Sequence, residues 1–407
     1  MLACLYNDGR LDAFRLLGRV VGPDMSGRGT VLIWKSGLLP YSETFIRHQL
    51  DALRRYRPVV VGTHRVDSPM ARGTDVIVYG DRSRDRLARR LFVMTGRSAR
   101  IEAVTRGVRP DLVHAHFGNE GWLIARTAGR SGCPLVVSLH GADVTAAPTA
   151  PGSAGARTRR RLRQAFERAA VLVAVSGFIR ERAIEWGADP AKVVVQPIGI
   201  PLPQPVAIDD PQWDCVFVGR FVAKKGAGDL VAALALIDPR VRPRCLFIGD
   251  GPLEAQVRQR AADLGVDATF LGAQPPATVR HHLARARVFV APSRTAPNGD
   301  AEGLPTTVLE ASAHALPVVA YRHSGIPEAV EHDRTGLLCA EGDVEQLAAH
   351  LARLLDDDQL AGRLGRAGRE RVERDFDITR CTAELEHLYD SVLARSTTAV
   401  TSVRCDR

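Results

Sequence analysis

Long apolar runs are absent from this sequence of 407 residues. No segment approaches the roughly 18–20 consecutive apolar residues that cross a bilayer, so we expect no transmembrane helix. Acidic residues and arginines interrupt the first residues of the chain, which therefore lack the apolar core of a secretory signal. These absences predict a soluble, cytoplasmic protein whose hydrophobic residues, 45% of the chain, build packed cores.

Cysteines are scattered, and aromatic residues make up only 5% of the chain. The cysteines are seven, an odd number without paired spacing, which excludes a zinc-finger pattern and argues against a disulfide framework. The aromatic residues do not interleave with the basic clusters, as the base-stacking platforms of nucleic-acid-binding proteins do. We therefore expect neither a structural metal nor a nucleic-acid partner.

Lysine is rare, because the chain has only Lys35, Lys192, Lys224 and Lys225. Arginines supply the rest of the positive charge, and the net charge is +14 for residues 1–205 but −5 for residues 206–407. Many of them gather at 54–57, 82–90 and 157–163. A solvated helix face is the simpler interpretation of any one cluster. The contrast between the halves leads to the hypothesis that the N-terminal half faces an anionic membrane surface, peripherally at the inner face of the cell membrane.

Short β-branched runs alternate with amphipathic stretches in both halves, a pattern typical of βα units around a parallel sheet. Strands are expected first at Thr30–Trp34, Val59–Gly62, Asp75–Tyr79, Asp111–Ala115, Pro134–Leu139 and Val171–Val175. A second series is expected at Asp214–Gly219, Arg244–Gly249, Ala268–Gly272, Arg287–Ala291, Pro317–Tyr321 and Gly336–Cys339. The proline-rich segment beginning at Pro201 separates the two series as a linker.

This alternation predicts an α/β protein with two Rossmann-like, doubly wound parallel-sheet domains that face a cleft. We expect the domains at residues 28–203 and 204–376, then a helix over 377–395 that packs back toward the first domain, and a tail over 396–407. Residues 1–27 are expected to be an extension outside the folded protein, with Met25 as an alternative start to Met1.

The segment of residues 291–321 is the most informative, because it passes from a strand through a polar loop into a helix. Pro305 is expected near the first helical position, where a missing N–H costs nothing. The amides around that helix start would form a cradle for a diphosphate. Glu302 in the loop and Glu310 on the helix could accept hydrogen bonds from sugar hydroxyls, although two glutamates alone would be ordinary surface charge.

A second informative segment, CVFVGRFVAKKGAGDL, covers residues 215–230. A strand ends at Gly219, and Arg220, Lys224 and Lys225 follow in the loop before the next helix. A planar guanidinium and a flexible ammonium suit a pyrophosphate, while solvated loop charge is the alternative. The later GDGP turn at Gly249–Pro252 permits close approach of a ligand but is common to many Rossmann-like folds.

These motifs resemble those of the retaining glycosyltransferases of family 4, which have the GT-B fold. The resemblance runs from about Thr30 to Ala394 and rests on EGLPTTVLEA from Glu302, GR...KKG at Gly219–Gly226, and GDGP. SETF at 42–45, HAHFG at 114–118 and LHGADV at 139–144 look like the branch that builds bacterial exopolysaccharides, including colanic-acid-type polymers. Where the family usually has a glycine pair in the first loop, this sequence has only Gly37.

The resemblance implies a nucleotide-diphosphate sugar as donor, bound by the C-terminal domain, and an acceptor bound by the N-terminal domain. Arg220 and Lys225 would neutralise the donor diphosphate, Glu302 would hold the transferred sugar and Glu310 the ribose. His140 would face the donor sugar and, with Glu302, form the catalytic pair. The other implied donor residues are Gly303, Leu304, Thr306 and Thr307, and the implied acceptor-side residues are Gly37, Ser42, Glu43, His116 and Ser176.

The implied reaction places negative charge on the departing diphosphate, which fixed cations and a helix N-terminus stabilise. Neither a metal nor a cofactor is expected, and the implied acceptor is a glycan or a polyprenyl-diphosphate-linked sugar in exopolysaccharide or other cell-surface glycan synthesis. Two alternatives stay open: a sugar-nucleotide epimerase of the same fold, and an inactive nucleotide-sugar-binding subunit. Product analysis with donor alone separates the epimerase from the transferase.

Overall fold

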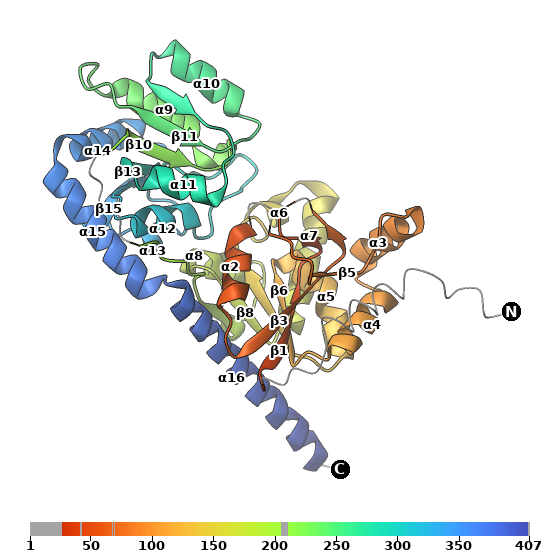
Figure 1. The fold of residues 1–407 in the computed structure, drawn as a ribbon. Coiled ribbons are helices and arrows are strands. Elements are labelled where there is room, and N and C mark those ends of the chain that lie inside the picture. The colour runs from red at the N-terminus through yellow and green to blue at the C-terminus, as the bar shows by residue number, and fades with distance from the viewer. Residues whose placement is uncertain (1–26, 41–42, 67, 69, 205–210, 406–407) are drawn as a thin grey trace.

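The computed structural model describes residues 27–40, 43–66, 68, 70–204 and 211–405, with side chains up to 396. Figure 1 shows two α/β halves, each with its own sheet. Ser42 and nearly all of the expected extension, residues 1–26, lie outside the described residues. No helix in the described ranges is long and apolar enough to cross a membrane.

A parallel sheet of seven strands forms the N-terminal half, in the order β5–β3–β1–β6–β7–β8–β9. The strands are β1 (Gly29–Trp34), β3 (Tyr56–Gly62), β5 (Val76–Ile77), β6 (Leu112–His116), β7 (Leu135–Leu139), β8 (Val171–Ala174) and β9 (Val193–Val195). A separate short pair joins β2 (Gly37–Leu38) and β4 (His64–Arg65). The short edge strand β9, with two of its three valines exposed, was not among the expected strands, and neither were β2 and β4.

The C-terminal half has a six-stranded parallel sheet in the order β12–β11–β10–β13–β14–β15. Its strands are β10 (Trp213–Val218), β11 (Cys245–Ile248), β12 (Ala268–Phe270), β13 (Ala286–Ala291), β14 (Val318–Tyr321) and β15 (Gly336–Cys339). In each sheet the chain adds strands on one side of its first strand, β1 or β10, and then crosses back to add the remaining strands on the other side, beginning with β6 or β13. The point of reversal is where open α/β sheets bind ligands.

Helices cover both faces of each sheet, and each sheet packs one apolar core on either face. The N-terminal helices are α2 (Thr44–Ala52), α3 (Ser83–Thr95), α4 (Ala99–Val108), α5 (Gly118–Arg130), α6 (Ala146–Thr149), α7 (Gly152–Arg168), α8 (Gly177–Glu185) and the 3-10 turn η2 (Pro190–Lys192). The C-terminal helices are the 3-10 turn η3 (Ala223–Lys225), α9 (Ala227–Leu236), α10 (Glu254–Asp263), α11 (Pro276–Leu283), α12 (Thr306–Ala313), α13 (Ile326–Ala329), α14 (Val344–Asp356), α15 (Asp358–Asp375) and α16 (Ile378–Cys405).

The last helix, α16, returns from the C-terminal half to the N-terminal half, as Figure 1 shows in dark blue. The Glu386 carboxylate accepts hydrogen bonds from the amides of Arg54, Arg55 and Tyr56. The Tyr389 hydroxyl lies 2.6 Å from His114 Nδ1 beneath the first sheet. The helix continues past residue 395, where we expected a tail to begin, and ends at Cys405.

Candidate active site

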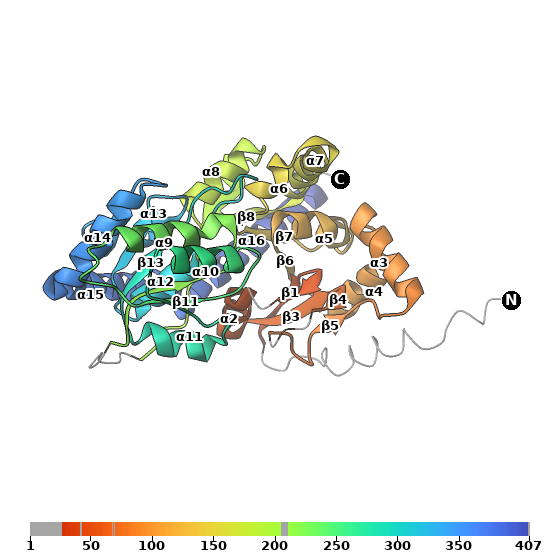
Figure 2. The ribbon, with the colours of Figure 1, turned by 90° about the horizontal axis from the view of Figure 1, so that it is seen from above.

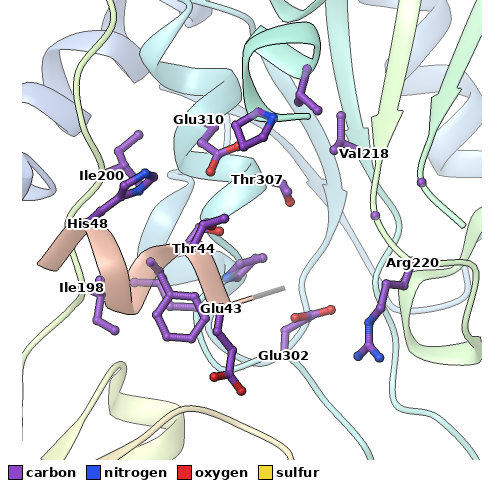
Figure 3. A pocket seen from close by; sticks show the side chains of 18 of the residues that line it. Glu43, Thr44, His48, Ile198, Ile200, Val218, Arg220, Glu302, Thr307 and Glu310 are labelled. Atoms are coloured by element: carbon purple, nitrogen blue, oxygen red, sulfur yellow. The ribbon is translucent and has the colours of Figure 1, made fainter. Parts of the chain in front are cut away.

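A cavity of about 1350 Å³ opens where the carboxyl ends of the two sheets face each other. Its N-terminal wall comes from α2 and the loops after β1, β6 and β7, and its C-terminal wall from α11, α12 and the loops after β10, β11 and β13. Figure 2 shows α2 between the two halves, and Figure 3 shows the side chains of both walls pointing into the same space. The cavity exceeds the roughly 300–1,000 Å³ typical of a single small-ligand site, so it has room for two substrates.

Glu302 lies at the centre of the C-terminal wall, almost fully buried. Lys225 Nζ lies 2.9 Å from Glu302 Oε1, and Lys224 Nζ lies 3.1 Å from Asp300 Oδ1 beside it. Burial is the largest single effect and would raise the pKa of Glu302, but the charges of Lys225 and Lys224, the hydrogen bond from Lys225 and the nearby His323 together lower the pKa. Glu302 is therefore a carboxylate at neutral pH, held by a cation that also faces the cavity.

The loop that carries the two lysines owes its path to Gly226, which has φ +66° and ends η3. A Cβ at this position would collide with the carbonyl oxygen of Pro292, so only glycine lets this loop pass close to the one after β13. Arg220 begins the same loop at the end of β10, and its exposed side chain makes no ion pair among the described residues. In Figure 3 Arg220 and Glu302 approach the pocket from different sides.

Helix α12 begins at Thr306, with Pro305 as its N-cap, so Pro305 lies next to the first helical position as expected. The amides of Thr306 and Thr307 have no carbonyl partner within the helix, and both residues line the cavity, as do Gly303 and Leu304. Glu310, one turn further along, forms no hydrogen bond or ion pair within the described ranges and also faces the cavity. Burial raises the pKa of Glu310 to about 7.

His140 directly follows β7 and lines the N-terminal wall of the cavity that Glu302 also lines. Its Nε2 lies 3.1 Å from His116 Nδ1, and the rings of Phe45 and Phe117 flank it at centroid distances of 5.1 and 4.6 Å. Burial lowers the pKa of His140 to about 3. The ring is therefore neutral at physiological pH and offers the cavity a dipole and a hydrogen-bonding nitrogen rather than a charge.

Asp143 holds the loop that carries His140, a role that sequence reasoning missed. Its carboxylate accepts hydrogen bonds from the amides of His140, Gly141 and Gly118, at 3.2, 2.9 and 2.9 Å. These bonds tie the loop after β7 to the start of α5. The signal was present in the LHGADV segment, because a short acidic side chain in the loop after a strand readily accepts hydrogen bonds from nearby backbone amides.

Glu43, at the start of α2, forms part of the N-terminal wall. Lys35 Nζ lies 3.3 Å from Glu43 Oε1 and 3.7 Å from Glu120 Oε1, and all three side chains are largely buried. Burial raises the pKa of Glu43 to about 7 even though Lys35 lowers it. Its Oε2 is buried without a hydrogen-bond partner, so the carboxyl group can receive a polar group from the cavity.

Three residues expected on the acceptor side do not reach the cavity wall. Gly37 pairs with His64 in the small β2–β4 ladder, and His116 lies fully buried behind His140. Ser176 instead joins the two halves, because its Oγ donates a hydrogen bond to the carbonyl oxygen of Gly303 at 2.9 Å. Polar residues at strand ends point either to the cleft or to the neighbouring loop, and sequence alone does not distinguish the two.

A second contact between the halves lies beside Ser176. The Glu328 carboxylate in α13 accepts hydrogen bonds from the amides of Gly177 and Phe178 at the start of α8, at 2.7 and 3.1 Å. An acidic group at a helix N-terminus is favourable, because it satisfies free amides and meets the positive end of the helix dipole. The two walls of the cavity are thus held together by hydrogen bonds as well as by packing.

Comparison with known proteins places this site in a family. Residues 42–203 match Glycosyltransferase Family 4, and residues 201–371 match Glycosyl transferases group 1. A relative named for colanic acid biosynthesis, the glycosyltransferase WcaL of Escherichia coli, is 32% identical over 295 residues, 70% of this chain and 71% of WcaL. The chain therefore belongs to the glycosyltransferase family that includes WcaL. It is accordingly a hexosyltransferase with the GT-B fold.

Two further similarities of this glycosyltransferase are to a curated relative and to a solved structure. The GDP-mannose-dependent alpha-(1-6)-phosphatidylinositol monomannoside mannosyltransferase of Mycobacterium tuberculosis is 40% identical over 174 residues, 42% of this chain and 45% of that protein. The structure of Anabaena HepE in complex with UDP superposes with a TM-score of 0.72 at 19% identity, covering 89% of this chain and 100% of HepE. The second likeness concerns the fold alone.

Two cavity residues of this glycosyltransferase carried no sequence signal. His48 in α2 and Arg280 in α11 line the cavity near Glu310. The charge of Arg280 lowers the pKa of both Glu310 and His48, although burial has the larger effect on each of them. On separate helices of separate domains, these residues look like ordinary surface charge in the sequence, and only the approach of the two halves brings them together.

Proposed function

We propose that this glycosyltransferase moves a sugar from a nucleotide-diphosphate sugar to an acceptor hydroxyl with retention of anomeric configuration. The observation that carries the proposal is the Lys225–Glu302 ion pair, which lines the same cavity as the start of α12 and His140. One cavity holds a cation, free helix amides and a carboxylate, and these groups match the diphosphate and the sugar of such a donor. The diphosphate needs positive charge, and the sugar needs hydroxyl acceptors.

Each donor group has a chemically matched partner in the cavity. Arg220, Lys225 and the amides of Thr306 and Thr307 bind the diphosphate, with Gly303 and Leu304 leaving room for it. Glu302 accepts hydrogen bonds from the transferred sugar, and Glu310 accepts them from the ribose. Complexes of the similarly folded HepE with UDP and with UDP-glucose support a nucleotide sugar as the donor class.

Transfer breaks the bond between the anomeric carbon and the diphosphate oxygen, whose electrons remain on the leaving group. The cations and helix amides stabilise that charge as it grows, and they interact more strongly with the transition state than with the bound donor. The acceptor oxygen attacks from the face that the diphosphate leaves, and a phosphate oxygen takes its proton. With these residues carrying the leaving-group charge, the reaction as proposed requires no metal.

The acceptor enters from the N-terminal wall, where Glu43 and His140 offer hydrogen-bonding groups. We propose a glycan or polyprenyl-diphosphate-linked acceptor, met at the inner face of the cell membrane during synthesis of an exopolysaccharide or another cell-surface glycan. The name of WcaL supports the polymer class. The name of the mycobacterial mannosyltransferase supports a lipid-linked acceptor, because a phosphatidylinositol mannoside is a membrane lipid.

A donor screen tests the proposal directly. UDP-, GDP- and ADP-sugars are compared for thermal stabilisation, and a specific donor at about 100 times its dissociation constant raises stability by about 2.7 kcal/mol. The stabilising donor, labelled in the sugar, is then incubated with lipid-linked saccharide acceptors. Transfer of label to the lipid fraction is the expected result. Epimerised donor without an acceptor supports the epimerase instead, and absence of any stabilisation refutes the donor site.

A further inference from the structure

Helix α3 exposes an apolar stripe on the outer surface of the N-terminal half. Leu87, Leu91 and Met94 are 60%, 53% and 69% exposed, and their spacing of four and then three residues places them on one side of the helix. Such large exposed fractions are unusual for three neighbouring apolar side chains on one helix. The opposite side of α3 is anchored in the core by Phe92, which is fully buried.

Arginines border this stripe on both sides. At 100° per residue, Arg84 and Arg90 lie on either side of the apolar side chains, and Arg86 lies further around the exposed face. All three are exposed, and none forms an ion pair in the part of the chain that the structure describes. Their positive charge is therefore available to an external partner, whereas the buried Asp85 of the same helix pairs with Arg100.

Helix α7 extends the basic surface next to α3. Arg161 donates hydrogen bonds to the carbonyl oxygens of Val93 and Met94, which joins the two helices. Burial lowers the pKa of Arg161, and the charge of the exposed Arg157 lowers it further. Like charges crowded in this way repel one another, and an anionic surface relieves that repulsion.

We propose that α3 docks on an anionic membrane, with Leu87, Leu91 and Met94 inserted among the lipids and Arg84, Arg86 and Arg90 bound to headgroup phosphates. An apolar stripe bordered by arginines is typical of helices that lie in the membrane interface. Figures 1 and 2 both show α3 at the outside of the N-terminal half, away from the C-terminal half, so a planar surface can reach it. The proposal goes beyond the charge contrast between the halves, because it assigns the contact to one helix and includes an apolar component.

Sedimentation of the full-length protein with vesicles tests this surface. Phosphatidylcholine vesicles with phosphatidylglycerol should sediment the protein at low salt, and vesicles of phosphatidylcholine alone should sediment far less. The variant Arg84→Ala/Arg86→Ala/Arg90→Ala should partition at least about ten-fold more weakly, since each basic residue near such a surface is worth about a five-fold change. Arg363→Ala/Arg366→Ala on the exposed face of α15 is the matched control and should bind as wild type does.

The apolar component is tested by Leu87→Ser/Leu91→Ser/Met94→Ser. This variant should also lose at least about ten-fold in partitioning, and the loss should persist at high salt, where the charge contribution is screened. Its matched control is Leu236→Ser/Leu264→Ser, which removes exposed apolar side chains from the C-terminal half. Donor-induced thermal stabilisation should be unchanged in every variant, so membrane binding and donor binding fail or succeed independently.

Two results would overturn the proposal. The first is equal sedimentation of the wild type and both α3 variants, because it places the membrane contact elsewhere. The second is a dimer that the serine variant dissociates in light scattering while no vesicle binds the wild type, because α3 would then cover a second copy of this chain.

Discussion

Gly303 and His140 meet across the two halves so closely that a Cβ on Gly303 would collide with the carbonyl oxygen of His140. The same Cβ would also lie 3.1 Å from Val175 Cγ2, so the site has no space for a side chain at residue 303. The loop that carries Glu302 and the loop that carries His140 are therefore in register only because residue 303 has no side chain.

We predict that Gly303→Ala forces these loops apart and lowers kcat/KM by about ten-fold or more, since misplacement by about 1 Å costs up to 10²-fold. Initial rates at several donor concentrations measure the effect. Gly129→Ala in α5 is the control, because a Cβ there meets open space, and it should keep wild-type rates. Wild-type rates in Gly303→Ala would show that this contact does not position the site.

Glu302→Gln should reduce transfer by about 10²-fold or more while leaving the fold intact. The amide keeps the shape of the side chain and one acceptor oxygen, but it removes the negative charge that pairs with Lys225 and that strengthens a hydrogen bond from a sugar hydroxyl. Transfer assays together with circular dichroism of the folded protein measure the two effects. Near-normal turnover would remove Glu302 from the reacting centre.

Arg220→Ala and Lys225→Ala should both weaken donor binding by about ten-fold or more, because each removes a charge-assisted contact to the diphosphate. Their effects on stability should differ. Lys225→Ala leaves Glu302 buried without its cation and should lower the free energy of unfolding by about 1–3 kcal/mol. Arg220→Ala leaves no buried group unpaired, so it should not lower the free energy of unfolding. Chemical denaturation measures this contrast, and wild-type kinetics in both variants would refute the diphosphate assignment.

Donor affinity should rise as the pH increases from 6 to 8, because the pKa of Glu310 is raised to about 7. Below that pH the group is mostly protonated and a poor acceptor for ribose hydroxyls, and above it the carboxylate accepts them. The expected change is up to about ten-fold, measured by calorimetric titration. Glu310→Gln should bind donor more weakly and with a flatter pH dependence. An unaltered profile in that variant would assign the titration to another group.

Glu43 makes a separate prediction about stability. Its pKa is raised to about 7 in the folded state from an ordinary value of 4.5. As the pH rises from 4.5 to about 7, the carboxyl group ionises in the unfolded chain before it does in the folded protein, so the folded protein loses stability over this range. Glu43→Gln should therefore raise the melting temperature relative to wild type at pH 8 and have little effect at pH 4. Two charged neighbours act on Glu43 in opposite directions, because Lys35 lowers its pKa and Glu120 raises it. Destabilisation at pH 8 would mean that the Lys35 ion pair outweighs the cost of burial.

Local patterns in the sequence were sufficient for twelve of the strands and for four polar residues of the C-terminal wall. Buried parallel strands are continuous apolar runs, so all twelve expected strands have counterparts in the described sheets. Arg220, Lys225, Glu302 and Glu310 follow or flank such runs, and the carboxyl ends of parallel strands necessarily meet at one edge of a sheet. Their roles in binding and catalysis remain predictions.

Tertiary structure decided which polar residues outside that wall face the cavity. His116 ends β6, and His140 and Ser176 closely follow β7 and β8, yet Ser176 joins Gly303 and His116 lies behind the site. The sequence also did not predict the exposure of Leu87 on α3, because an apolar stripe along a helix ordinarily indicates the side that faces the core. Chain-local periodicity determines which residues share a face of an element. What that face meets depends on contacts between segments distant in sequence, and those form only when the two halves pack together.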